Sequence, residues 1–234
     1  MEEMKNLFAT QPFTIAFVLG VYLASTYLYK RTRLPLLHPV LLSIAVIMLT
    51  LKCFGVEYET FKESSQLIDF MLGPVVVALG YTLYEQVEHV KQNLLSMLTA
   101  IAVGSFIGIA SVAFIAKWMG ADTSMMVALA PKSVTTPIAI SISEQFGGIP
   151  PLTAVVVVIV GVFGGVAGPF ILRKLGIHSK IALGLSMGAA AHGLGTARAL
   201  ELGVIEGAIS GLAIGLMGLA TALWVPVFRL MGLF

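Results

Sequence analysis

The sequence predicts an all-α polytopic integral membrane protein with about eight apolar segments. Hydrophobic residues make up 58% of the 234 residues and charged residues only 11%, whereas a soluble domain carries about 25% charged residues. Apolar runs near the roughly 20 residues that a helix needs to cross the hydrocarbon core recur along nearly the whole chain. Too few charges therefore remain to cover a water-facing surface.

The apolar segments follow one another through short links. The first ends at the basic stretch YKRTR, the fourth ends at Trp118, which suits the membrane interface, and the sixth lies between IPP and LRK. The fifth and seventh carry polar clusters, and the eighth has glycines four residues apart. The expected segments are 11–29, 36–54, 66–84, 94–118, 124–144, 152–172, 181–200 and 207–231.

The two halves of the chain resemble each other under a shift of 115 residues. This shift aligns LPLLHPVLLSI (34–44) with IPPLTAVVVVI (149–159) and GPVVVALG (73–80) with GAAAHGLG (188–195). One shift that serves two regions indicates an internal duplication. We expect a single membrane domain over residues 1–234, with repeat 1 at about 10–119 and repeat 2 at about 124–234.

Basic loops follow the first and sixth segments, at YKRTRLP and LRKLGIHSK. Basic loops stay on the cytoplasmic side, yet eight crossings would put these two on opposite sides. They share a side if the third and seventh segments, interrupted at Gly73 and Pro74 and between Gly188 and Gly195, enter and leave on one face. Three crossings and one re-entrant segment per half would make the repeats inverted, as in transporters with a substrate site near the midplane.

A lysine and three hydroxyls stand between two prolines in the fifth segment, in ALAPKSVTTPIAI (128–140). Pro131 and Pro137 disturb a helix, so we expect an interruption around 132–136 and a restart near Pro137. A restarted helix points its N-terminal amides at the break, where they attract anions. Alternatively, the lysine reaches the membrane interface and the hydroxyls bond to their own helix. The candidate anion-binding residues are Lys132, Ser133, Thr135 and Thr136.

A second polar cluster lies in the seventh segment, in GAAAHGLGTARALE (188–201). Its small residues allow a tight, irregular backbone, an arginine can grip a carboxylate with two parallel hydrogen bonds, and a histidine can carry a proton near neutral pH. Alternatively, His192 is a satisfied packing residue and Arg198 marks the membrane surface beside Glu201. The candidate substrate-binding residues here are His192, Gly193, Gly195, Thr196 and Arg198.

The other features favour neither an enzyme nor a nucleic-acid-binding protein. The net charge is only +2, the single cysteine, Cys53, excludes an internal disulfide, and the four histidines have no metal-ligand spacing. No nucleotide-binding loop and no nucleophile–base pair is visible, so we expect no catalytic residue, no metal and no cofactor. Glycines at 207, 211 and 215 allow close helix packing, which also suits a homo-oligomer.

Four stretches resemble the LrgB family, also called CidB-like or antiholin-like membrane proteins. They are LGPVVVALGYTLYE, LAPKSVTTPIAI, GVFGGVAGP and AAAHGLGTARALE, and the resemblance runs from about residue 10 to the C-terminus. For bacterial members it implies a partnership with small LrgA-type or CidA-type holin-like membrane proteins and an effect on murein hydrolase activity and cell lysis. For plastidal relatives, in which both parts are fused, it implies exchange of glycolate and glycerate, and for some bacterial pairs uptake of pyruvate.

Two functions stay open on this basis. The first is a transporter of small monocarboxylates such as pyruvate, glycolate or glycerate, which holds the anion between the two polar breaks and works by alternating access. The second is an antiholin-like regulator of murein hydrolase export or activity that acts with an LrgA-type or CidA-type partner. Either function places the chain in a lipid bilayer, and we expect the bacterial cytoplasmic membrane.

Overall fold

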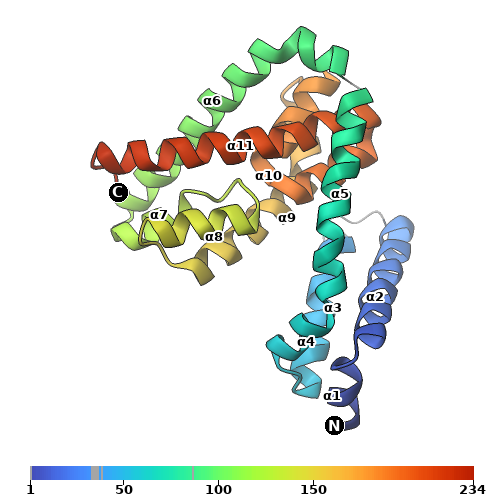
Figure 1. Cartoon of the computed structure of the whole chain (residues 1–234). Helices are drawn as coiled ribbons and strands as arrows, with labels where there is room; N and C mark the ends of the chain where they lie inside the picture. Colours follow the sequence, from blue (N-terminus) through green and yellow to red (C-terminus); the bar gives the residue numbers. More distant parts are fainter. Residues whose placement is uncertain (1, 33–36, 38, 86) are drawn as a thin grey trace. The chain divides into compact units, whose positions relative to one another are not determined.

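The computed structural model describes residues 2–32, 37, 39–85 and 87–234, and helices account for most of them (Figure 1). The chain divides into two compact units, residues 1–78 and 79–234. In chain order the helices are α1 (Glu2–Phe8), α2 (Gln11–Thr32), α3 (Pro39–Phe54), α4 (Tyr58–Ser64), α5 (Gln66–Glu85), α6 (Val87–Trp118), α7 (Thr123–Leu129), α8 (Thr136–Gln145), α9 (Pro150–Lys174), α10 (Lys180–Leu202) and α11 (Val204–Leu230).

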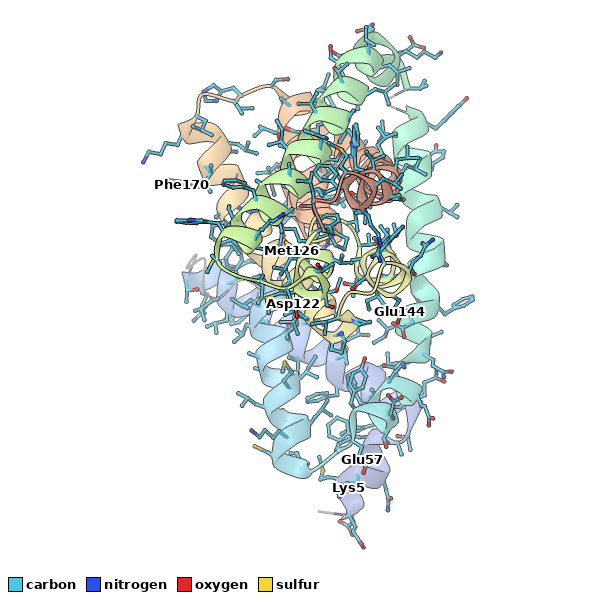
Figure 2. All side chains as sticks on the ribbon, turned by 90° about the vertical axis from the view of Figure 1, so that its left-hand side faces the viewer. Lys5, Glu57, Asp122, Met126, Glu144 and Phe170 are labelled. Atoms are coloured by element: carbon cyan, nitrogen blue, oxygen red, sulfur yellow. The ribbon has the colours of Figure 1, made fainter. Side chains whose placement is uncertain are left out.

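In the first unit, α2 packs against α3 and α4, and the short helix α1 packs on α2. The ring of Phe8, at the end of α1, is fully buried and meets Phe13 and Phe17 edge-on, each at 5.1 Å between ring centroids. The Thr14 hydroxyl donates to the Phe8 carbonyl at 2.9 Å. Edge-to-face aromatic contacts and a satisfied buried hydroxyl explain why α1 folds onto α2. Near this end of the unit, the side chain of Lys5 approaches Gly55, close to Glu57 (Figure 2).

In the second unit, α10 packs against both α9 and α11, while α6 packs on α11 and α7 and α8 pack on α9 (Figure 1). Two glycines let α10 and α11 approach closely. A methyl group at Gly184 would lie 2.4 Å from the Glu206 carbonyl oxygen, and one at Gly188 would lie 2.2 Å from that of Ser210. Small residues at such contacts are the usual means by which helices pack in lipid.

The described residues include four helices that are long and apolar enough to cross a membrane: α2, Lys91–Trp118 within α6, α9 and α11. Helix α3 is a shorter apolar helix. Large apolar side chains point outward from these helices, as Phe170 of α9 does with 69% of its surface exposed (Figure 2). Such exposure in a soluble protein would favour aggregation, but it is expected of a surface that faces lipid. The chain is therefore an all-α polytopic integral membrane protein, as its sequence predicts.

The eight predicted segments correspond in order to α2, α3, α5, α6, the pair α7 and α8, α9, α10 and α11. The predicted interruption at Gly73 and Pro74 is wrong, because α5 continues as one helix across Pro74. A proline removes one backbone donor, and in this helix that loss does not end the hydrogen-bonded ladder. The duplication into repeats, their inversion and the re-entrant topology stay predictions.

Candidate functional site

The fifth segment is interrupted as the sequence predicts. Helix α7 ends at Leu129, residues 130–135 form turns, and α8 begins at Thr136 with Pro137 in its first turn. Thr135 is the N-cap residue of α8 in an extended conformation, with φ −65° and ψ 150°. Proline in the first turn suits a helix start, and the unpaired amides of that start face the interruption.

Helix α7 is also fixed at its start. The Asp122 side chain accepts a hydrogen bond from the Met125 backbone amide at 2.8 Å, a helix-capping contact. One turn after Asp122, the side chain of Met126 is buried (Figure 2). The cap and the buried face hold α7, from which the turns with Lys132 continue.

Lys132 lies in these turns, within a segment that is otherwise apolar. Its ammonium donates to the Ser133 hydroxyl at 3.1 Å, and Ser133 is only 9% exposed. An ammonium has three N–H donors, and Lys132 makes no other hydrogen bond and no ion pair in the part of the chain that the structure describes. Donors are therefore left over for a ligand.

Two cavities adjoin Lys132 in this unit. The first, of about 330 Å³, lies among α6, α10 and α11, and the second, of about 300 Å³, lies between α9 and α10. Four residues line both cavities: Lys132, Ser133, Ser186 and Ala190. We call these four residues the shared wall.

Within the part of the chain that the structure describes, the polar side chains that line either cavity all belong to the shared wall, namely Lys132, Ser133 and Ser186. The other described residues of both linings are apolar or glycine. Lys132 is the sole charged residue among the described residues of the two linings. Apolar surroundings with a few convergent polar groups are typical of small-molecule sites. A charged group in such a setting within a membrane protein is by default a functional-site hypothesis.

The seventh segment is also interrupted, in the middle of α10. Ala191 has φ −128° and ψ 16°, and His192 has φ 42° and ψ −131°. The chain reverses here, because a methyl group at Gly195 would lie 2.1 Å from the Met187 carbonyl oxygen, a contact that a straight helix does not allow. The predicted break between Gly188 and Gly195 is therefore confirmed.

Three interactions hold this reversal in place. The His192 imidazole Nε2 lies 3.0 Å from the Val157 carbonyl oxygen of α9. The Thr196 hydroxyl donates to the His192 carbonyl at 3.0 Å and lies 2.8 Å from the Ser210 hydroxyl of α11. A hydroxyl has one proton to donate, so Ser210 is the donor in the second contact. The reversal is thus bonded to α9 on one side and to α11 on the other.

Glycines of α9 make room for the reversal. A methyl group at Gly161 would lie 2.6 Å from the His192 imidazole, and one at Gly164 would lie 2.5 Å from the Ala191 methyl. Only glycine allows this approach, since real methyl contacts are longer. The glycines of GVFGGVAGP in α9 therefore form the surface against which the α10 reversal packs.

The structure places the predicted site residues in different settings. Lys132 and Ser133 line both cavities, whereas Thr135 and Thr136 form the start of α8. His192, Gly195 and Thr196 build the reversal, and Gly193 is exposed with open space where a side chain would lie. Arg198 pairs with Glu201 and lines neither cavity.

Sequence reasoning missed Ser186, which lines both cavities beside Lys132. It stands in LGLSMGAAAHG, directly before the polar cluster of residues 188–201. A single serine among small residues carries no pattern. The one available signal was its position two residues before the expected break, which begins at Gly188.

The fold and the interrupted helices define an α-helical integral membrane protein with a lysine-bearing break beside two cavities. The chain belongs to the LrgB-like family, whose model matches residues 18–231.

Among its relatives, a Bacillus subtilis (strain 168) protein named "Uncharacterized protein YxaC" is 37% identical over 213 residues, which cover 91% of this chain and 93% of the relative. A second protein of that strain, "Uncharacterized protein YwbG", is 37% identical over 88% of this chain and 92% of its own length. The "Antiholin-like protein LrgB" of Bacillus mycoides (strain KBAB4) is 33% identical over 94% of this chain and 96% of its own length. No solved structure matches the chain.

Proposed function

We propose that this protein binds a small monocarboxylate anion at Lys132 and moves it across the membrane by alternating access. The observation that carries the proposal is that, among the described residues, the polar side chains of both cavities lie on the shared wall and Lys132 is the one that carries a charge. A substrate that reaches this wall from either cavity meets the same ammonium. Alternating access requires such a site, reachable from two directions in turn.

The chemistry of the linings favours an anion with one charge. No acidic residue lines either cavity among the residues that the structure describes, and the amide end of α8 adds positive potential to that of Lys132. One ammonium balances one carboxylate, so a second carboxylate would be desolvated without a partner. The proposed substrates are pyruvate-, glycolate- or glycerate-like anions.

The size of the cavities favours a short substrate. Their volumes of about 330 and 300 Å³ lie at the lower end of the roughly 300–1,000 Å³ of ligand sites. Their apolar linings suit a carbon chain of a few atoms. A small anion whose body has only a few carbon atoms fits both parts of the site.

The second break contributes to this proposal in a different way from the first. His192, Gly195 and Thr196 hold the α10 reversal that carries Ser186 and Ala190 of the shared wall. Arg198 is paired with Glu201 in this state. We propose that Arg198 leaves Glu201 and meets the carboxylate in another state of the cycle, when one interrupted unit moves against its neighbours.

A second candidate function is the antiholin-like role, and the names of the relatives favour it over transport. The Bacillus mycoides and Bacillus cereus relatives are named antiholin-like protein LrgB. In this role the chain acts in the bacterial cytoplasmic membrane with an LrgA-type or CidA-type holin-like partner and affects murein hydrolase activity and cell lysis. Such a role depends on assembly, and it should tolerate loss of the Lys132 charge.

Uptake into proteoliposomes separates the two candidates. Labelled pyruvate, glycolate and glycerate are offered to the purified protein, with and without a pH gradient and with and without an LrgA-like partner. Transport predicts saturable uptake that Lys132→Gln and Arg198→Gln abolish, whereas Lys180→Gln, an exposed lysine at the start of α10, leaves it unchanged. No uptake by the folded protein in any combination would overturn transport and favour the antiholin-like role.

A further inference from the structure

Ser186 joins Lys132 and Ser133 as the third polar side chain of the shared wall. It lies in the first half of α10, before the reversal at Ala191 and His192. The lysine and this serine therefore come from different interrupted segments. A ligand that contacts both would link the two breaks.

The Ser186 hydroxyl differs from several other serine hydroxyls of the described helices. Among the helical serines there whose hydroxyls make no hydrogen bond, namely Ser25, Ser96, Ser124 and Ser186, it is the one that lines the two cavities. Ser43, Ser105, Ser111 and Ser141 each donate to a backbone carbonyl three or four residues earlier in their own helix, at 2.6–3.0 Å. Within the described ranges, Ser186 makes no hydrogen bond. Serine in an apolar helix usually bonds to the preceding turn, so a free hydroxyl on a cavity wall is available to a ligand.

We propose that Ser186 is a substrate-contacting residue that sets specificity by binding an oxygen next to the carboxylate. This inference rests on the proposed function, because it assumes that the carboxylate itself lies at Lys132. The Ser186 hydroxyl then meets a 2-oxo or 2-hydroxy oxygen of the same small acid. Simple alkanoates lack that oxygen and leave the hydroxyl without a partner.

The physical basis is the asymmetry of buried hydrogen bonds. A site that hydrogen-bonds a polar group of its substrate rejects an analogue without that group far better than an apolar pocket rejects an extra group. The penalty arises because the unpaired hydroxyl loses water and gains nothing. Ser186 would thus separate glycolate from acetate, and lactate from propionate, although each pair has the same carbon skeleton.

The test compares equilibrium binding of labelled glycolate and acetate to the purified full chain. The wild type should prefer glycolate, and Ser186→Ala should weaken glycolate binding by about tenfold, the effect of one lost hydrogen bond. Acetate binding should not weaken, because the variant has no hydroxyl for acetate to leave unpaired. Ser141→Ala is the matched control, since that hydroxyl is already bonded to the Pro137 carbonyl at 3.0 Å. An undiminished glycolate preference in Ser186→Ala would overturn the inference.

A chemical measurement distinguishes this inference from the proposed function. The single cysteine, Cys53, is exposed and is first replaced by serine, after which Ser186→Cys and Ser141→Cys are each treated with N-ethylmaleimide. Glycolate should slow modification of the Ser186→Cys variant severalfold and leave the Ser141→Cys variant unaffected. If Lys132→Gln abolishes glycolate binding while glycolate never protects the Ser186→Cys variant, only the specificity inference fails. If the wild type binds neither acid, the proposed function fails and this inference fails with it.

Discussion

The His192 imidazole Nε2 lies 3.0 Å from the Val157 carbonyl oxygen, across 35 residues of chain. A carbonyl oxygen only accepts, so Nε2 carries the proton of this bond. His192 is 6% exposed and has a backbone φ of +42°. Residues other than glycine rarely adopt a positive φ. The bond to α9 therefore holds a strained reversal in α10, and that reversal carries part of the shared wall.

The strain at His192 predicts an unusual order of stability. His192→Ala loses the bond to Val157 and keeps the unfavourable φ, whereas His192→Gly loses the bond and removes the strain. We expect the glycine variant to be more stable than the alanine variant by about 1 kcal/mol, measured by thermal unfolding in detergent. At Ala197, an exposed helical position in α10, substitution by glycine should instead destabilise. A His192→Ala variant more stable than His192→Gly would contradict the positive φ.

A substitution at Gly164 tests whether α9 packs closely against the reversal in α10. Gly164→Ala places a methyl group 2.5 Å from the Ala191 methyl, and overpacking of this kind costs about 1–3 kcal/mol. The variant should melt at a lower temperature than the wild type. Gly215→Ala is the matched control, because open space surrounds that position in α11; it should be neutral or stabilising, since alanine favours a helix. Equal melting temperatures for the two variants would rule out the close approach of α9 and α10.

The hydroxyls of Thr196 and Ser210 are predicted to be energetically coupled. They lie 2.8 Å apart and both are buried. A double-mutant cycle with Thr196→Val and Ser210→Ala should give a coupling free energy of about 0.5–1.5 kcal/mol, measured by unfolding of the four proteins. Additive single effects would mean that the two hydroxyls do not bond to each other and that α10 is not tied to α11 there.

Much of the fold follows from the sequence, because long apolar runs and paired prolines act locally. Pro131 and Pro137 correctly predict the interruption between α7 and α8, and the glycine-rich run correctly predicts the reversal in α10. Pro74 shows the limit of this reasoning. A single proline removes one hydrogen bond, and whether the helix then ends depends on its surroundings, so α5 continues through it.

The site is less predictable, since it depends on which side chains share a cavity. The charge of Lys132 is visible in the sequence, but its position beside two cavities arises from the packing of α6, α9, α10 and α11. The role of Ser186 cannot be read from the sequence for the same reason. It depends on the cavities that this serine lines and on the absence of a hydrogen bond to its own helix. Arg198 has suitable chemistry for a carboxylate, and its pairing with Glu201 depends on the local helix.

The central claim is that the Lys132 ammonium binds a small carboxylate, and equilibrium binding tests it most directly. Labelled pyruvate and glycolate are titrated against the purified wild type, Lys132→Gln and the control Lys180→Gln, with thermal unfolding used to check that each variant is folded. We expect saturable binding by the wild type and Lys180→Gln, and at least about tenfold weaker binding by Lys132→Gln, since a charge-assisted hydrogen bond contributes about 1.5–3 kcal/mol. Equal binding by wild type and Lys132→Gln, or no binding by the folded wild type, would contradict the account.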